Sequence, residues 1–235
     1  MEAPDLPGEP VVWTAARPVD GRELSGSRVL LRSVQPDRDA RELYPATHAP
    51  DGDPSVWTYL PHGPHADEQA MRDWLAEYAD STDRRCYTVS SPAERRALGI
   101  ACYLNINEQH GTIEVGSILF SPALQRTTAA TEAIYLLMHH AFDALGYRRV
   151  EWKCNALNVP SRRAAERFGM SFEGIFRNHM VVKGRSRDSA WFAATDGDWP
   201  AIKDGFERWL QAGNFDRRGR QLASLSDLIA AARGR

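Results

Sequence analysis

The stretch 115–145 contains residue types that together favour binding of an anion. An apolar run at 115–120 ends at Ser121-Pro122, and the polar turn Gln125-Arg126-Thr127-Thr128 follows it. Apolar residues then recur at helical spacing up to Gly146, where a helix end is expected. A strand, a turn of small residues and a helix N-terminus offer backbone N–H groups and a positive dipole end. We therefore interpret the turn as a candidate pyrophosphate site.

The cysteines and histidines form no pattern that indicates a metal or a disulfide framework. Cys86, Cys102 and Cys154 are odd in number and widely spaced, and there is no Cys-x-x-Cys pair. His62 and His65 lie in a proline-rich loop without a third ligand, so no metal is expected. No histidine is close to Cys154 in sequence, so a buried strand thiol is a simpler interpretation of this residue than a catalytic nucleophile.

Composition and charge argue against a nucleic-acid-binding or membrane-spanning protein. The chain has 235 residues, of which 43% are hydrophobic and 26% charged, with a formal net charge of −2. A near-neutral chain does not carry the general electrostatic footprint of a nucleic-acid-binding protein. No apolar run reaches the length of a membrane span, and the N-terminus lacks an apolar signal core. We expect a cytoplasmic protein with neither nucleic acid nor membrane as a partner.

The predicted elements alternate in a way that indicates an α/β (α+β) fold. Strands are expected at 28–34, 86–90, 97–105, 111–120, 148–155, 175–182 and 188–194. Helices are expected at 36–44, 67–80, 129–145, 160–168, 199–210 and 222–232. The helix between 111–120 and 148–155 makes that strand pair parallel, within an otherwise mostly antiparallel mixed sheet of six or seven strands with helices on both faces.

The same pattern suggests three parts of the chain. Residues 1–27 are rich in proline and glycine and are expected to form an N-terminal arm. Residues 28–198 are expected to form the domain, and 199–235 a C-terminal helical extension. The proline-rich loop at 48–64 is long for a compact domain, which is often a sign of function.

The turn resembles the phosphate loop of the GNAT acetyltransferase superfamily. Gln125-x-x-Thr128-x-Ala130, continued by Thr131-Glu132-Ala133, is similar to the Arg/Gln-x-x-Gly-x-Gly/Ala motif, particularly in the branch that acetylates N-termini of ribosomal proteins. The resemblance implies a splayed parallel strand pair and binding of the acetyl-CoA pyrophosphate by backbone amides and a hydroxyl. The matching residues are Gln125, Arg126, Thr127, Thr128, Ala129, Ala130 and Thr131. Thr128 replaces the usual glycine, and its hydroxyl either donates to the phosphate, which we favour, or crowds it. The alternative is that Thr127 or Thr128 only caps the helix.

A second segment resembles the family at the expected place downstream. Asn158-Val-Pro-Ser161, followed by Gly169-Met170, is similar to the family's Asn-x-x-Ser…Gly-Phe pattern. The resemblance implies that Asn158 binds the pantetheine arm and that the Ser161 hydroxyl protonates the departing thiolate. Alternatively, both residues only begin a helix.

The splayed strand is expected to bind the rest of the pantetheine. The resemblance implies that amides of Ile118, Leu119 and Phe120 pair with pantetheine. A backbone N–H near Leu119 would stabilise the oxyanion of the reaction.

Acetyl transfer also needs a group that removes a proton from the amine. By resemblance, Glu114 at the start of the splayed strand is the first candidate for this base and for contact with the substrate. His179 on the last hairpin is the second. Trp57 and Tyr59 in the proline-rich loop either line the cleft that binds the acceptor or pack within the loop itself. Glu114 could instead be a solvated or structural strand residue.

The basic hairpin tip also has two interpretations. Lys183, Arg185 and Arg187 are either solvated or meet an anionic acceptor.

These features predict an acetyl-CoA-dependent N-acetyltransferase. The acetyl group would pass directly, in a ternary complex, to a primary amine of a protein N-terminus or a small molecule. The alternative is a non-catalytic acyl-CoA-binding module with a regulatory or interaction role. A homodimer is compatible with the resemblance, because the family often pairs through its last strands and helices.

Overall fold

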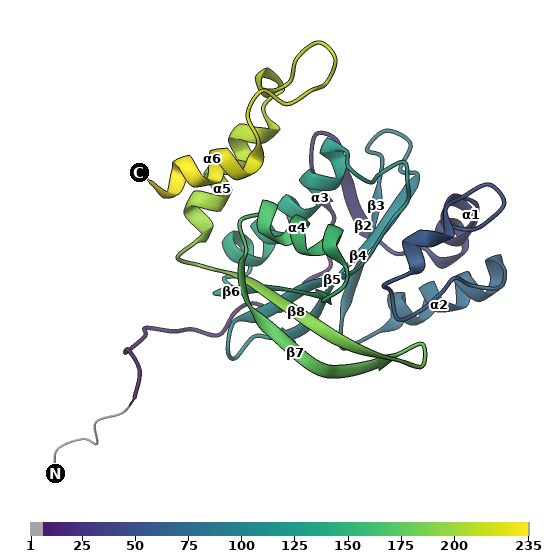
Figure 1. Ribbon diagram of the computed structural model, residues 1–235, viewed down its shortest axis with the longest axis horizontal. Helices are drawn as coiled ribbons and strands as arrows, with labels where there is room; N and C mark the ends of the chain where they lie inside the picture. The colour runs from purple at the N-terminus through teal and green to yellow at the C-terminus, as the bar shows by residue number, and fades with distance from the viewer. Residues whose placement is uncertain (1–6, 235) are drawn as a thin grey trace.

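The computed structural model describes residues 7–234, which fold around one eight-stranded sheet with the order β1-β2-β3-β4-β5-β6-β8-β7 (Figure 1). The strands are β1 (Leu24–Ser25), β2 (Leu30–Ser33), β3 (Arg85–Ser90), β4 (Ala97–Asn107), β5 (Thr112–Phe120), β6 (Arg149–Asn155), β7 (Ser171–Val182) and β8 (Arg185–Thr195). The α-helices are α1 (Pro36–Thr47), α2 (Glu68–Asp80), α3 (Thr128–His139), α4 (Val159–Arg167), α5 (Trp199–Leu210) and α6 (Leu225–Arg233). Shorter turns are η1 (Pro54–Trp57), the π-helical η2 (His140–Ala144) and η3 (Ala212–Asn214).

The sheet confirms the predicted mixed topology. β5 and β6 are parallel and are joined through α3, whereas all other neighbouring strands are antiparallel. The eighth strand is the two-residue β1, which pairs with β2 from within the segment expected to be an arm. Residues 1–6 of that arm lie outside the described residues.

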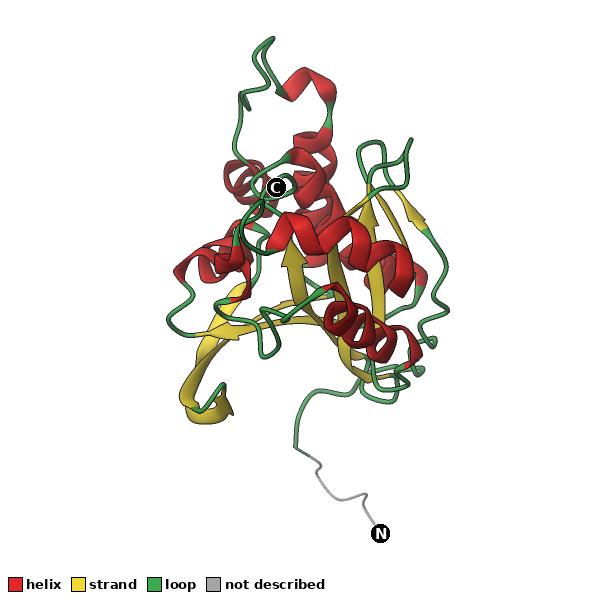
Figure 2. Ribbon diagram, turned by 90° about the vertical axis from the view of Figure 1, so that its right-hand side faces the viewer, coloured by secondary structure: helices red, strands yellow, loops and turns green. Residues whose placement is uncertain are grey.

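Helices cover both faces of the sheet (Figures 1 and 2). On one face, α3 and α4 pack on β5, β6 and β8, with α5 and α6 beside them, and residues such as Val115, Leu137 and Phe206 form this core. On the other face, α1 and α2 bury a second cluster that includes Leu43 and Trp74. Strands β5 and β6 thus lie in the sheet between these two layers of helices.

The last hairpin extends past the other strands. β7 and β8 reach towards the side of the sheet that carries α1 and α2 (Figure 1). At its tip, Lys183 Nζ donates to the Trp57 carbonyl at 2.9 Å. The hairpin is thereby fixed to the loop between α1 and α2.

The cysteines correct one prediction. Cys86 and Cys102 lie directly opposite each other on β3 and β4 and form a disulfide. The expectation of no disulfide was wrong because sequence spacing does not reveal which residues of two strands face each other. Cys154 is free and buried, as predicted.

No helix in residues 7–234 is both long and apolar enough to cross a membrane.

Candidate active site

The parallel strands β5 and β6 separate in the middle of the sheet. Their pairing runs from Thr112↔Arg149 to Glu114↔Glu151 and ends there. β5 then contains an extra residue opposite β4, and Ser117 has a φ of 47°. Such a bulge bends and twists a strand. Within the described part of the chain, β5 beyond Glu114 therefore has one backbone edge without a partner strand.

This free edge contains the three strand residues expected to bind pantetheine. Leu119 and Phe120 remain paired with β4 on their other side, and Ile118 lies within the bulge that precedes them. Gln125 Nε2 donates to the Phe120 carbonyl at 2.9 Å, which holds the end of the strand against the turn that begins α3.

The turn before α3 has both a cap and free amides. Thr127 is the N-cap, because its Oγ1 accepts from the Ala130 amide at 3.1 Å and donates to the Leu124 carbonyl at 2.6 Å. Among the described residues, the amides of Arg126, Thr128 and Ala129 donate no hydrogen bond. Free N–H groups at a helix N-terminus are suited to an anion. The capping interpretation of Thr127 is thus correct, and unbonded donors lie beside it.

Thr131 already has partners within the protein. Its hydroxyl donates to the Thr127 carbonyl at 3.4 Å and accepts from Arg167 Nη1 at 3.1 Å, and the residue is buried. Arg167 also lies over the Trp209 ring, at 4.9 Å from its centre. Arg167 therefore connects the C-terminal extension to the start of α3.

Asn158 and Ser161 lie at the start of α4. Asn158 Oδ1 accepts from the Ser161 amide at 3.1 Å, so Asn158 caps this helix. The Ser161 hydroxyl accepts from Trp152 Nε1 at 3.0 Å. An indole N–H is only a donor, so this contact does not use the hydroxyl proton of Ser161, which can bond the Cys154 sulfur. Burial raises the pKa of the neighbouring Cys154 thiol, which favours its neutral form.

Glu114 is a buried carboxylate with two donors. It is 2% exposed, and its Oε2 accepts from Asn105 Nδ2 at 2.6 Å and lies 3.2 Å from Lys153 Nζ. Burial raises the pKa of Glu114, while Lys153 and Asn105 oppose that rise. A Cβ at Gly116 would approach Glu114 Oε1 to 2.9 Å, so the glycine leaves room for the carboxylate. Glu114 is therefore not a solvated strand residue.

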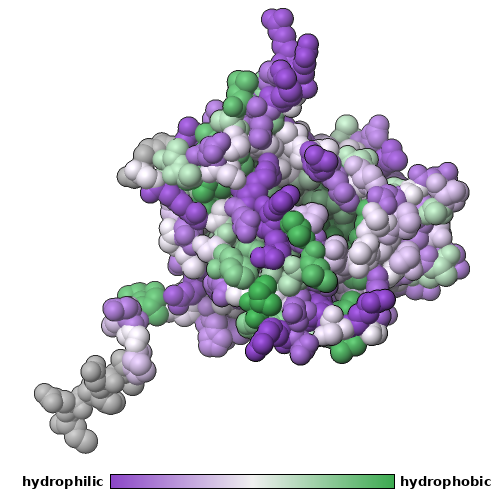
Figure 3. Space-filling view, in the orientation of Figure 1, coloured by the Kyte–Doolittle hydropathy of each residue, from purple (hydrophilic) through white to green (hydrophobic). Residues whose placement is uncertain are grey.

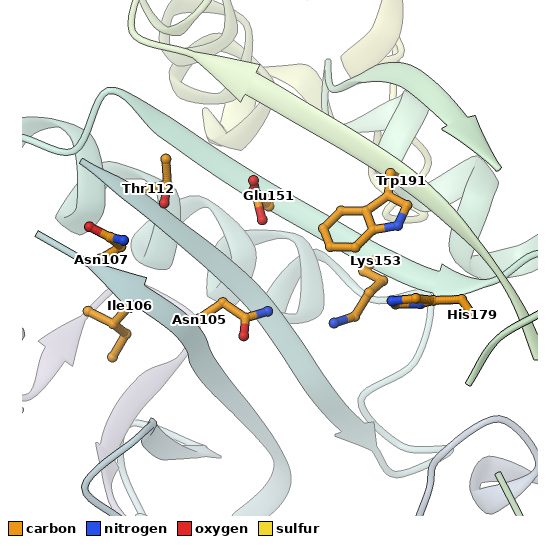
Figure 4. Close-up of a pocket in the computed structure, with 8 residues that line it drawn as sticks. All are labelled: Asn105, Ile106, Asn107, Thr112, Glu151, Lys153, His179 and Trp191. Atoms are coloured by element: carbon orange, nitrogen blue, oxygen red, sulfur yellow. The ribbon is translucent and has the colours of Figure 1, made fainter. Parts of the chain in front are cut away.

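An open cavity of about 590 Å³ lies beside this ion pair (Figure 4). Its lining residues are Asn105, Ile106, Asn107, Thr112, Glu151, Lys153, His179 and Trp191. Lys153 Nζ lies 5.1 Å from the centre of the Trp191 ring. His179 is held by a contact of 2.9 Å between its Nδ1 and Ser189 Oγ. His179, the second candidate base, therefore lines the same cavity as Lys153.

The two aromatic residues of the proline-rich loop differ. Trp57 is fully buried, and its Nε1 donates to the Thr47 carbonyl at 3.0 Å. The prediction that it walls the acceptor cleft was wrong, because its ring belongs to the core under α1 and α2. Tyr59 is partly exposed, and its hydroxyl donates to the Leu157 carbonyl at 3.2 Å, one residue before Asn158.

Sequence reasoning missed residues that complete this cavity. Asn105 and Lys153 contact Glu114 from β4 and β6, and only strand register shows this. Trp191 of β8 also lines the cavity. Alternation along β6 was the available signal, because it places Lys153 and Glu151 on one face and Trp152 on the other.

Comparisons with known proteins agree with this geometry. Residues 28–171, more than half of the chain, match a family model described as an acetyltransferase (GNAT) domain. The structure is similar to that of a GCN5-related N-acetyltransferase from Brucella melitensis, with a TM-score of 0.89 and 40% identity over 93% of this chain and 99% of that chain. An uncharacterized N-acetyltransferase p20 from Bacillus licheniformis is 24% identical over 144 residues, which are 60% of this chain and 80% of that protein.

A more distant structure has the same fold. It is an acetyl transferase from Salmonella typhimurium that modifies the N-terminal serine of a 50S ribosomal subunit protein. It has a TM-score of 0.63 and 15% identity over 74% of this chain and 99% of that chain.

Proposed function

This chain belongs to the GNAT acetyltransferase family, and on that premise we propose that it transfers the acetyl group of acetyl-CoA directly to a primary amine. The observation that carries the proposal is the end of the β5–β6 pairing at Glu114↔Glu151. It leaves a strand edge without a partner beside a buried carboxylate. An amide edge and a base at one place are what an acyl transfer to an amine requires.

The residues of the chain fit acetyl-CoA as the co-substrate. Bound acetyl-CoA supplies the thioester acetyl group. The unbonded amides of Arg126, Thr128 and Ala129 suit its pyrophosphate, and the Thr127 cap fixes the turn that presents them. The free β5 edge at 118–120 suits the amide groups of pantetheine, and Asn158 begins the helix beside it. Gln125 orients the turn through the Phe120 carbonyl, and Ala130 and Thr131 complete its first helical turn.

Three side chains would then accept or donate the protons that move during the transfer. Glu114 accepts a proton from the amine, directly or through a water, and Lys153 favours its charged form. A free α-amino group has a pKa of about 7.7–8.0, so a modestly basic carboxylate is sufficient. Ser161, whose oxygen accepts from Trp152 and whose hydroxyl also interacts with Cys154, would turn its proton to a sulfur leaving group. His179, whose Nδ1 contacts Ser189, is the second candidate base.

The acceptor is a peptide N-terminus or a small amine. A direct test incubates the protein with acetyl-CoA and a panel of both kinds of amine and follows thiol release. Thermal stabilisation by CoA together with amine-dependent thiol release supports the proposal. Stabilisation by CoA without turnover on a broad panel would favour the alternative of a non-catalytic acyl-CoA-binding module. Absence of both effects would contradict both.

A homodimer through the last strands also belongs to this proposal. β7 is an edge strand, and Phe172, Phe176 and Val181 on it are exposed. Figure 3 shows apolar side chains gathered over β7 and β8 and over α4. Analytical ultracentrifugation would give the mass in solution, and a monomer at all concentrations would contradict the dimer. A cytoplasmic location remains a prediction from the sequence.

A further inference from the structure

Arg187 on β8 is a buried cation without a partner. The residue is 8% exposed, and its Nε is buried without a hydrogen-bond partner. Among residues 7–234, its guanidinium makes no ion pair and no hydrogen bond. The matched case in this chain is Arg32, 1% exposed, whose guanidinium lies 2.6 Å from Asp39 Oδ1. The Nε of both arginines is buried without a partner, so the difference between them is the ion pair, which Arg187 lacks.

An arrangement of this kind costs stability. A buried charge is normally paired, because neither water nor a counter-ion otherwise replaces its hydration. Burial lowers the pKa of Arg187, and the groups that oppose this effect are Cys154 and Glu114. The candidate base is close to the same part of the sheet, because Lys153, which contacts Glu114, lies opposite Trp191 of β8. A group that costs stability at such a place indicates binding of a ligand.

The strand places a second unpartnered donor on the same face. Side chains alternate along a strand, so Arg187, Ser189 and Trp191 share one face of β8. Trp191 lies opposite Lys153 of β6 and lines the cavity, and its Nε1 is also buried without a partner. Between them, the Ser189 hydroxyl contacts His179. This face of β8 thus presents two groups that only donate hydrogen bonds.

Two charged side chains that line the cavity, Lys153 and Glu151, are already paired. Lys153 contacts Glu114, and Glu151 lies 2.7 Å from Arg149 Nε. Arg187, on the same face of β8 as the cavity residue Trp191, makes no ion pair within residues 7–234. A planar guanidinium binds a carboxylate through two parallel hydrogen bonds, which a single ammonium group cannot do.

We propose that the acceptor is an amine that carries its own carboxylate, which Arg187 binds while the amino group faces Glu114. The acceptors would be amino acids or peptides that begin with aspartate or glutamate. This inference rests on the proposed function, because it names the substrate class of the same site.

The test uses matched acceptor pairs. Wild-type protein is assayed by thiol release with β-alanine and propylamine, and with the peptides Asp-Ala-Ala and Asn-Ala-Ala. O-phosphoethanolamine separates phosphate from carboxylate. We expect kcat/KM to be about a hundredfold higher for the better carboxylate acceptor than for its neutral partner. Equal rates, or a preference for the neutral amine or the phosphate, would overturn the assignment.

Variants connect the preference to Arg187. Arg187→Met should reduce the ratio of carboxylate to neutral acceptor to about one, and Arg187→Lys should restore part of it. The control Arg185→Met removes an exposed charge from the same strand and should keep the wild-type ratio. A wild-type ratio in Arg187→Met would contradict the proposal. Arg187→Met should also unfold at the same temperature as wild type or higher, whereas a paired structural arginine would make it unfold lower.

A binding measurement separates this inference from the proposed function. Succinate is titrated into the protein in the presence of CoA, and calorimetry measures its affinity. Binding that Arg187→Met weakens at least tenfold supports the carboxylate site even if no amine is acetylated, in which case only the proposed function fails. Turnover of neutral amines without any succinate binding overturns the carboxylate site and leaves the proposed function intact.

Discussion

Lys153 Nζ on β6 lies 3.2 Å from Glu114 Oε2 on β5, and this ion pair joins the two parallel strands at the place where their backbone pairing ends. Glu114 is 2% exposed and Lys153 18% exposed at the side chain, so solvent screens their interaction less than at the surface. The pair holds a carboxylate at the start of the free strand edge. The site thus depends on this contact across the gap.

Glu114→Gln should lower kcat. The amide keeps the size of the side chain but cannot accept the proton of the amine, and general-base catalysis contributes about a hundredfold to ten-thousandfold. The affinity for CoA, measured by calorimetry, should stay within about twofold. The exposed Glu77→Gln serves as the control for loss of a carboxylate. Full activity in Glu114→Gln would remove Glu114 from the mechanism and favour His179.

Lys153→Met should move the acid side of the pH–rate profile to higher pH. Burial raises the pKa of Glu114, and a carboxylic acid below its pKa is protonated and cannot act as a base. Activity therefore falls as pH falls through that raised pKa. Lys153 favours the charged form, so its loss raises the pKa further.

The conservative variant provides the control for this shift. Lys153→Arg keeps the positive charge and should retain a profile closer to wild type. An unchanged acid limb in Lys153→Met would show that Glu114 is not the group that titrates.

Thr127→Ala should lower both the free energy of unfolding and the affinity for CoA. The Thr127 hydroxyl caps α3 through the Ala130 amide, and loss of an N-cap costs about 1 kcal/mol of the free energy of unfolding. The same turn presents the unbonded amides, so its loosening should lower CoA affinity several-fold. Thr127→Ser keeps the cap and should behave as wild type in denaturant unfolding and in calorimetry. Loss of stability with unchanged CoA affinity would show that the turn does not bind the phosphates.

Thr128→Gly tests whether the side chain adds to the backbone. The Thr128 hydroxyl has no hydrogen-bond partner among the described residues, so it is available to donate to a phosphate. We expect about a tenfold to hundredfold loss of CoA affinity, in line with a hydrogen bond to a charged group. Thr128→Ser should retain the affinity. Equal or tighter binding in Thr128→Gly would show that the hydroxyl is incidental.

Much of the fold could be predicted from local pattern. The helical spacing between 111–120 and 148–155 required a crossover, and that strand pair is parallel in the structure. Gly146, at a φ of 77°, ends the helical segment as expected. β1 could not be predicted, because a two-residue strand has no detectable alternation. The Cys86–Cys102 disulfide depends on cross-strand register, which the spacing of two cysteines does not contain.

Only part of the candidate site could be predicted from the sequence. Its position relative to the strands followed from the motifs, and Glu114 lies where the parallel pairing ends. The groups that act on Glu114 come from β4 and β6, and only the folded sheet brings them together. Trp57 was misplaced because an aromatic residue in a proline-rich loop has the same sequence signature whether it faces a cleft or the core.

The most direct test of the account is the fate of an isotopically labelled acetyl group. The protein is incubated with 13C-acetyl-CoA and the panel of amines, and mass spectrometry measures label in the amine and in the protein. Direct transfer predicts labelled N-acetylated amine, strongly reduced in Glu114→Gln, and no labelled protein intermediate in the absence of amine. Protein that binds CoA but labels no amine in the panel would contradict catalysis. Label held covalently by the protein would contradict direct transfer.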